Sequence, residues 1–229
     1  MYGAYFNNTF TNVLVYYIFL LLLLLISPFL FIWEIITNLR SCFQPIENMS
    51  GKVVLITGAS SGIGELMAYE YAKRGAIFVD ETIRHYGRLD HLVCNAGIAS
   101  LYSSKTDITK FAPVMDVNFW GSVYPTHFAI PHLMRTGGKI VVSKSALISF
   151  YESLRFEVSP TITITILTLG YIETNLITVK NLTNGIGVGV RLKKDFRSVL
   201  PTTGAEPCAK AIVNGVCKGA TSITEPRCI

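Results

Sequence analysis

Charged residues are missing from the start of this chain: the first 33 of its 229 residues contain no Lys, Arg, Asp or Glu. The 20 basic and 15 acidic residues all follow Trp33, while 50% of the chain is hydrophobic. Apolar and aromatic residues this plentiful exclude a disordered chain. The uneven charge indicates a globular domain with a lipophilic segment in front of it.

Cysteine pairs and dense basic stretches are also missing. The five cysteines form no Cys-x-x-Cys pair, so neither a disulfide framework nor a structural zinc site is expected. Their spacing suits a reducing compartment. A net charge of +5 without a broad basic stripe argues against a nucleic-acid partner. No metal site is predicted, because His127 and His132 do not share a helix face.

An uncharged apolar run extends from Val13 to Trp33. As a helix these 21 residues would span about 31 Å, the thickness of a bilayer core. We interpret the run as an uncleaved anchor, because a signal peptide would need a basic start and a small-residue cleavage site. Pro28 favours a kink, so the alternatives are a straight span and a bent insertion. The chain then divides into an anchor, a linker and a domain: residues 1–33, 34–50 and 51–229.

Strand and helix patterns alternate after the linker. Lys52–Thr57 is a continuous apolar run, typical of a strand buried on both faces of a parallel sheet. Pro125 is expected to interrupt a long helix. The alternation predicts an α/β fold, a Rossmann-like doubly wound parallel sheet. The further expected elements are a helix at 63–74, a strand and turn at 89–97, a helix at 107–134, a strand at 139–143, a helix at 145–158 and a strand at 161–172.

Glycines join the first strand to the first helix in the spacing Gly58-x-x-x-Gly62-x-Gly64. The first glycine makes the turn, the second lets the backbone approach a phosphate, and the third allows close helix–strand packing. A pyrophosphate would rest on the N–H groups at the positive end of the helix dipole. Between a strand and a helix, this spacing predicts a dinucleotide-binding turn rather than a structural glycine turn.

Several motifs together resemble the short-chain dehydrogenase/reductase family: Thr57–Gly64, Asn95–Gly97, Asp116–Asn118 and Leu169–Thr174. Three further segments resemble, more narrowly, the plant 11-beta-hydroxysteroid dehydrogenase-like proteins, or steroleosins: Gly51–Thr57, Gly87–Val93 and Val117–Tyr124. The resemblance implies an NADP-dependent oxidoreductase that interconverts a hydroxyl and a ketone on a steroid-like lipid, with NAD left open as the cofactor. It also implies an anchor in the endoplasmic reticulum membrane or on a lipid droplet, a domain facing the cytosol, and a homodimer.

The resemblance assigns roles to individual residues. Asn118 would anchor a water molecule in the proton path. Lys144 would hold the nicotinamide ribose and lower the pKa of a tyrosine four residues before it, because a phenol is a poor base without a nearby cation. The positions that match the family's cofactor-binding motifs are Gly58, Ser60, Ser61, Gly62, Ile63, Gly64, Asn95, Ala96, Gly97, Lys144, Ile172 and Thr174.

One departure from the family falls on its catalytic residues. The position four residues before Lys144 is Ile140, inside a strand, and the substrate-positioning serine is missing with its loop. Tyr151 follows Lys144 by about 10 Å along a helix, which is too far to replace the tyrosine. Ser143 is interpreted as a structural serine at the strand end, with a position facing the cleft as the alternative.

A second departure follows Gly75. If Ala76–Val79 is the second strand, Asp80 would be the ribose ligand of an NAD enzyme. Only residues 80–88 would then return to the next parallel strand, where a dozen or more residues are usual. We favour the alternative that residues 79–82 belong to a later helix of the family and that about 50 residues are absent.

Two hypotheses about function follow from these patterns. The glycine turn, Asn95–Gly97, Asn118 and Lys144 support residual oxidoreductase activity. The missing serine and tyrosine support a catalytically inactive, lipid-anchored remnant or isoform. The second hypothesis is favoured as a statement about catalysis.

Overall fold

The computed structural model gives the protein two compact units, Met1–Pro45 and Ile46–Ile229. The residues that the structure describes are 2–78, 87–98, 108–170, 172–173 and 203–226.

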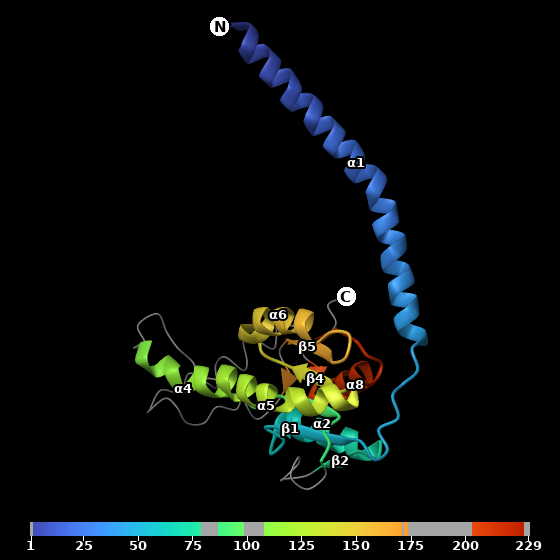
Figure 1. The fold of residues 1–229 in the computed structure, drawn as a ribbon, viewed down its shortest axis with the longest axis vertical. Helices are drawn as coiled ribbons and strands as arrows, with labels where there is room; N and C mark the ends of the chain where they lie inside the picture. The colour runs from blue at the N-terminus through green and yellow to red at the C-terminus, as the bar shows by residue number, and fades with distance from the viewer. Residues whose placement is uncertain (1, 79–86, 99–107, 171, 174–202, 227–229) are drawn as a thin grey trace. The chain divides into compact units, whose positions relative to one another are not determined.

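The first unit is one helix, α1 (Tyr2–Phe43), which bends along its length (Figure 1). It contains the stretch Asn12–Trp33, whose 22 residues are long and apolar enough to cross a membrane. Pro28 lies within this stretch, and the helix continues on both sides of it. The predicted apolar helix is therefore present, and it is longer than the apolar run.

Helix α1 extends into the segment predicted as a linker, residues 34–50. Helix α1 continues to Phe43, so the non-helical connection begins only after that residue. Residues 34–43 contain neither proline nor glycine, and the first helix-breaking residue is Pro45. The first charged residues after Trp33 ended the anchor in the sequence pattern, but they do not end a helix.

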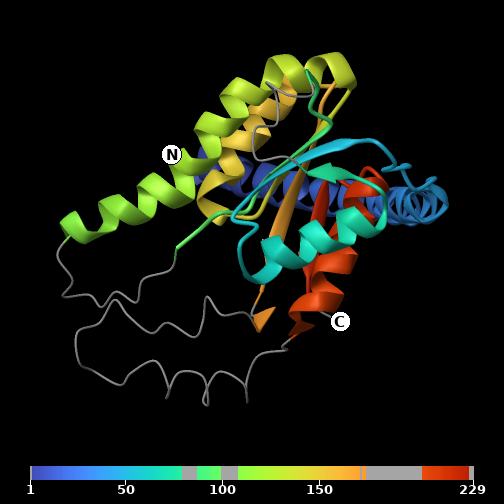
Figure 2. The ribbon, with the colours of Figure 1, turned by 90° about the horizontal axis from the view of Figure 1, so that it is seen from below.

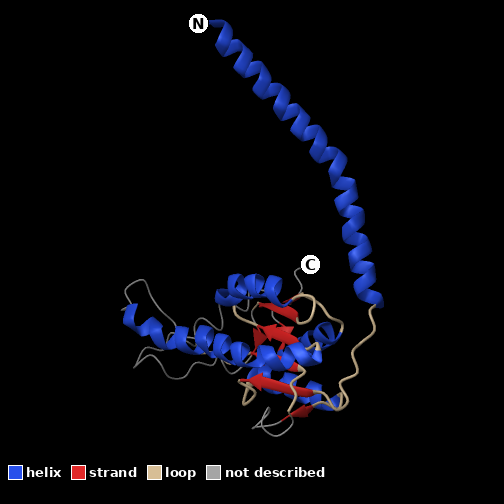
Figure 3. Ribbon diagram, viewed as in Figure 1, coloured by secondary structure: helices blue, strands red, loops and turns tan. Residues whose placement is uncertain are grey.

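The second unit is built on a six-stranded sheet in the order β2-β1-β3-β4-β5-β8, with every neighbouring pair parallel (Figure 3). The register places Leu92, Ile140 and Ile164 side by side across its middle strands. The strands are β1 Val53–Thr57, β2 Ile77–Phe78, β3 His91–Cys94, β4 Lys139–Val142, β5 Thr163–Leu169 and β8 Ser222–Glu225.

Helices cover both faces of this sheet (Figure 2). In β4, Ile140 and Val142 pack toward α5 and α6, whereas Val141 packs toward α2 and α8. This period of two, apolar on both faces, is that of a strand between two helical layers. The predicted doubly wound α/β fold is confirmed. The helices of the two layers are α2 Gly62–Lys73, α5 Gly121–Thr136, α6 Ile148–Val158 and α8 Ala205–Cys217.

The long helix predicted at residues 107–134 is a run of helical segments. It comprises η1 Ile108–Phe111, α4 Ala112–Met115, the π-helical turn η2 Asp116–Trp120, and α5. The predicted interruption at Pro125 is wrong, because α5 runs through it. The ring of a helical proline meets the carbonyl four residues earlier, here that of Gly121, directly after the wider π-helical turn.

The second strand of the sheet is short and lies at its edge. Ile77 and Phe78 pair with Val53 and Val54, so the second strand that was considered for residues 76–79, and not favoured, is present at these two residues. Asp80 and the helix favoured for residues 79–82 lie outside the described residues. In the common doubly wound order a further strand lies beyond the second one, and within the described ranges no strand pairs with that edge.

Charged side chains hold the segment before β1 to the amino end of the sheet. The Glu47 carboxylate lies 2.7 Å from Lys139 Nζ, 3.0 Å from Lys52 Nζ and 3.2 Å from His91 Nε2. Burial opposes ionisation of Glu47, but the hydrogen bonds from His91 and Lys139 hold its pKa well below the usual range. Burial lowers the pKa of His91, so its ring is neutral in the fold.

Candidate functional site

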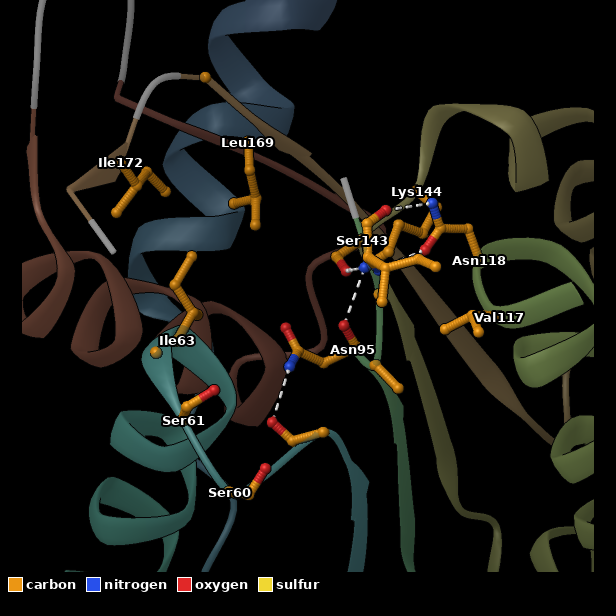
Figure 4. A pocket seen from close by; sticks show the side chains of 16 residues that line it. Ser60, Ser61, Ile63, Asn95, Val117, Asn118, Ser143, Lys144, Leu169 and Ile172 are labelled. Atoms are coloured by element: carbon orange, nitrogen blue, oxygen red, sulfur yellow. Dashed lines mark hydrogen bonds between the residues drawn. The ribbon is translucent and has the colours of Figure 1, made fainter. Parts of the chain in front are cut away.

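A cavity of about 530 Å³ opens where β1, β3, β4 and β5 end (Figure 4). The chain runs from β1 to β2 in one direction and then to β3 on the other side, and doubly wound folds bind ligands at such a switch point. Gly64 lies behind the cavity wall in α2, and Thr174 lies outside the described residues. The predicted residues that line the cavity are Gly58, Ser60, Ser61, Gly62, Ile63, Asn95, Ala96, Gly97, Asn118, Lys144 and Ile172.

The glycine turn after β1 leaves no space for a side chain at Gly58 or at Gly64. Gly58 has a φ of +70°, and a Cβ there would lie 2.7 Å from the Cα of Ala96. A Cβ on Gly64 would overlap the carbonyl oxygen of Gly58 and lie 2.5 Å from Asn95 Nδ2. The first glycine is therefore required by the turn and by its neighbour, and the third by close packing of α2 against the turn.

Thr57 fastens the turn after β3 to the turn after β1. Its Oγ1 accepts hydrogen bonds from the backbone N–H groups of Asn95, at 3.0 Å, and Ala96, at 3.1 Å. The Asn95 side-chain amide donates back to the carbonyl oxygens of Thr57 and Gly58, each at 3.4 Å. The two turns thus form one wall of the cavity, and a displacement of either one moves the other.

The amino end of α2 faces this cavity without a side-chain cap. Ser61 precedes the helix in an extended conformation and makes no capping hydrogen bond. The first N–H groups of a helix have no partner within the helix and carry its positive dipole end. A glycine cradle beside an uncapped helix end fits the pyrophosphate of a dinucleotide.

Lys144 reaches the cavity from the residues that follow β4. Its Nζ donates hydrogen bonds to the backbone oxygen of Asn95, at 2.8 Å, and to Ser143 Oγ, at 3.1 Å. Its stem packs on Gly97, where a Cβ would lie 2.5 Å from Lys144 Cε. Burial lowers the pKa of Lys144. Lys144 is the one charged side chain among the described residues that line the cavity.

Asn118 secures the same wall from the helical layer. Its Oδ1 accepts from the N–H of Ile98 and its Nδ2 donates to the carbonyl oxygen of Ile98, both at 2.9 Å. Asn118 lies in the π-helical turn, a feature often found at functional sites. The side-chain amide is therefore engaged with the protein itself.

Neither residue 140, the family's tyrosine position, nor Tyr151 reaches the cavity. Ile140 is 0% exposed and packs between the sheet and the α5–α6 layer. Tyr151 is also fully buried; its hydroxyl lies 2.6 Å from Thr126 Oγ1 and donates to the Ser122 carbonyl at 3.2 Å. Burial raises the pKa of Tyr151. Within the described part of the chain, no tyrosine lines the cavity.

Sequence reasoning missed part of the lining. Ser143 faces the cavity, so the interpretation of it as a purely structural serine is wrong and the alternative holds. Its position directly after β4 was the available signal, because the carboxyl ends of parallel strands meet at one edge. The other missed lining residues are Ile98, Val117, Leu169 and Gly170.

Comparison with known proteins gives related sequences over most of the chain. A profile of short chain dehydrogenases matches residues 76–142. The chain is 36% identical over 281 residues to 11-beta-hydroxysteroid dehydrogenase-like 4A of Arabidopsis thaliana, covering 96% of this chain and 91% of that protein. It is 40% identical over 255 residues to 11-beta-hydroxysteroid dehydrogenase 1A of the same plant, covering 82% and 72%.

The first of these alignments is longer than the chain itself. It runs over 281 positions, whereas the chain has 229 residues, so at least 52 positions fall opposite gaps in this chain. The expectation that a stretch of the family's sequence is absent agrees with this difference.

Solved structures share the fold at low sequence identity. Ligand-free aldohexose dehydrogenase of Thermoplasma acidophilum has a TM-score of 0.67 and 20% identity, covering 79% of this chain and 94% of that one. A Burkholderia phymatum short chain dehydrogenase/reductase in complex with NAD has a TM-score of 0.64 and 16% identity, covering 77% and 89%. The 3-ketoacyl-(acyl-carrier-protein) reductase of Brucella melitensis complexed with NADH has a TM-score of 0.65 and 22% identity, covering 77% and 97%.

Proposed function

Because this chain belongs to the short-chain dehydrogenase/reductase family, we propose that its cavity binds a nicotinamide dinucleotide, specifically NADP(H). The observation that carries the proposal is the glycine cradle, in which neither Gly58 nor Gly64 has room for a Cβ. Two neighbours in fold were solved with NAD or NADH, which supports the same class of ligand. NADP(H) rather than NAD(H) follows from the resemblance to the plant hydroxysteroid dehydrogenases.

Different residues of the cavity would contact different parts of the dinucleotide. The N–H groups at the start of α2 would hold the pyrophosphate, and Ser60 and Ser61 would contact it. Lys144 would hold the nicotinamide ribose, and Ile172 would pack near the nicotinamide. When bound, the dinucleotide supplies or accepts a hydride. The protein orients the dinucleotide and donates or accepts the proton.

We further propose that oxidoreductase turnover of a steroid-like alcohol or ketone is weak in this chain. The family's tyrosine position is taken by Ile140, whose side chain is buried in the core between the sheet and the α5–α6 layer. A general acid contributes about 100-fold to 10,000-fold to such a step. The alternative function, a cofactor-binding protein without catalysis, is favoured by the same observation.

Helix α1 is proposed to anchor the protein in the endoplasmic reticulum membrane or on a lipid droplet, with the domain in the cytosol. The stretch Asn12–Trp33 would be about 33 Å long, enough for a bilayer core. Its apolar side chains are exposed and are not buried by other parts of the described chain. Flotation of the expressed protein with microsomes or oil bodies tests this. Protein that stays in the soluble fraction would contradict it.

A homodimer is proposed through the α5–α6 layer. Its outer surface carries exposed aromatic side chains, with Tyr124 58%, Phe128 69% and Phe156 87% exposed. Exposed apolar surface of this kind marks interaction sites. Light scattering on the detergent-solubilised chain should give the mass of two chains. The mass of one chain would contradict the proposal.

The function is tested by measuring binding and turnover on one preparation. The full chain in detergent is titrated with NADPH and with NADH, and NADPH oxidation is then followed with a panel of ketosteroids. We expect saturable binding, tighter for NADPH, with slow oxidation. Fast oxidation would contradict the weakened catalysis, whereas no binding of either dinucleotide would contradict the proposed function as a whole.

A further inference from the structure

Ser143 and Lys144 form a hydrogen-bonded pair inside the cavity (Figure 4). The chain leaves β4 at Val142, and a helical turn begins at Ser145. Ser143 and Lys144 therefore lie between the strand and the helix, and both side chains turn to the same side. Lys144 Nζ lies 3.1 Å from Ser143 Oγ.

Of the described cavity residues, Ser143 is the hydroxyl best placed to meet a reacting oxygen. Ser60 and Ser61 lie in the glycine turn, at the end of the cavity that fits the pyrophosphate. The Asn118 amide is occupied by the backbone of Ile98. Ser143 is also next to a cation that can supply protons.

A serine hydroxyl is a weak acid by itself and can give up its proton only if another proton replaces it. An ammonium group hydrogen-bonded to the same oxygen provides that replacement. Burial lowers the pKa of Lys144 from its ordinary value of about 10.4, which makes its ammonium a better proton donor. The pair thus has the parts of a two-step proton relay.

We propose that Ser143 is a catalytic residue in this chain: it delivers the proton that the family's tyrosine would deliver, and Lys144 resupplies it. The inference rests on the proposed function. In ketone reduction a bound reduced nicotinamide would supply a hydride to the carbonyl carbon, and the π electron pair would move to the carbonyl oxygen. That oxygen takes the Ser143 hydroxyl proton as Ser143 Oγ takes one from Lys144 Nζ. The ketone would be reduced at the expense of the reduced nicotinamide, and the neutral Lys144 amine would recover its proton from water, which leaves hydroxide.

The first test measures how Ser143 affects the titration of Lys144 in the absence of cofactor. Acetic anhydride labelling of Lys144 is followed by mass spectrometry across a pH series in the wild type, Ser143→Ala and Ser143→Thr. Loss of Oγ removes an acceptor from the ammonium, so the labelling midpoint should fall in Ser143→Ala and stay near wild type in Ser143→Thr. Equal midpoints in the wild type and Ser143→Ala would overturn the proposed pair.

The second test measures proton delivery. At saturating NADPH, the single-turnover rate of NADPH oxidation by ketosteroids should fall about 100-fold or more in Ser143→Ala. Ser143→Thr should keep most of this rate. The wild type should be slower in D2O. Equal rates in the wild type and Ser143→Ala, or no turnover by an NADPH-loaded wild type, would overturn the relay. A wild type that does not bind NADPH would instead overturn the proposed function.

Discussion

Replacing Gly58 by alanine should weaken dinucleotide binding at least about tenfold while the domain remains folded. The residue has a φ of +70°, a left-handed conformation that costs an alanine about 1–2 kcal/mol. The new Cβ would also lie 2.7 Å from the Cα and 3.0 Å from the N of Ala96. Both are backbone atoms, so the turns after β1 and β3 must separate, and the cradle for the pyrophosphate widens.

Gly51 offers a matched control for this substitution. Its φ is +72°, and a Cβ placed on it would meet no heavy atom within 4 Å. Gly51→Ala therefore carries the left-handed cost without the steric overlap. We expect Gly51→Ala to lower the free energy of unfolding by about 1–2 kcal/mol and to bind NADPH like the wild type. Gly58→Ala should lower it further and bind NADPH at least about tenfold more weakly, a loss of about 1.4 kcal/mol.

Both variants are compared by urea unfolding and by NADPH fluorescence titration of the full chain in detergent. We expect both variants to lose stability but only Gly58→Ala to lose affinity for NADPH. This expectation would be refuted if Gly58→Ala bound NADPH as tightly as Gly51→Ala, because the close approach to Ala96 would then have no bearing on the site.

Three other perturbations have expected outcomes. Ile140→Tyr overfills a buried position between Leu92 and Ile164, so it should lower the free energy of unfolding by about 1–3 kcal/mol and give no gain in NADPH oxidation; restored turnover would contradict this. Thr57→Val removes the acceptor of the Ala96 N–H and one of the two acceptors of the Asn95 N–H, so it should cost about 1–3 kcal/mol in urea unfolding, whereas Thr57→Ser should cost much less. The lowered pKa of buried His91 keeps its ring neutral in the fold, so its stabilising contribution is present above the unfolded pKa of about 6.5 and is lost as pH falls toward the folded pKa. Melting temperatures should therefore drop between about pH 7 and about pH 5, and a flat profile would be the contrary result.

The sequence was sufficient for the layers of the fold and for the wall of the cavity. A buried apolar strand leading into Gly58, Gly62 and Gly64 has few structural solutions, because the spacing fixes a turn and a close helix contact. The position of Ile140 four residues before Lys144 likewise predicted a missing tyrosine, and the structure places that side chain in the core.

Other features depend on contacts that a local pattern does not contain. The direction of the Ser143 side chain depends on the backbone path between the end of β4 and the next helical turn. Residue spacing alone does not determine that path. The end of α1 follows from Pro45 and not from the first charged residues after Trp33. Pro125 was expected to break a helix, but the preceding π-helical turn allows α5 to continue.

The central claim is that the dinucleotide cradle is intact although the family's tyrosine position is buried. Hydrogen–deuterium exchange of the full chain with and without NADPH tests it most directly, because it reports on the amides that would hold the ligand. The account predicts slower exchange at Gly58–Gly64 and Asn95–Ile98 when NADPH is present. Unchanged exchange in these two segments at a saturating concentration of NADPH would contradict it.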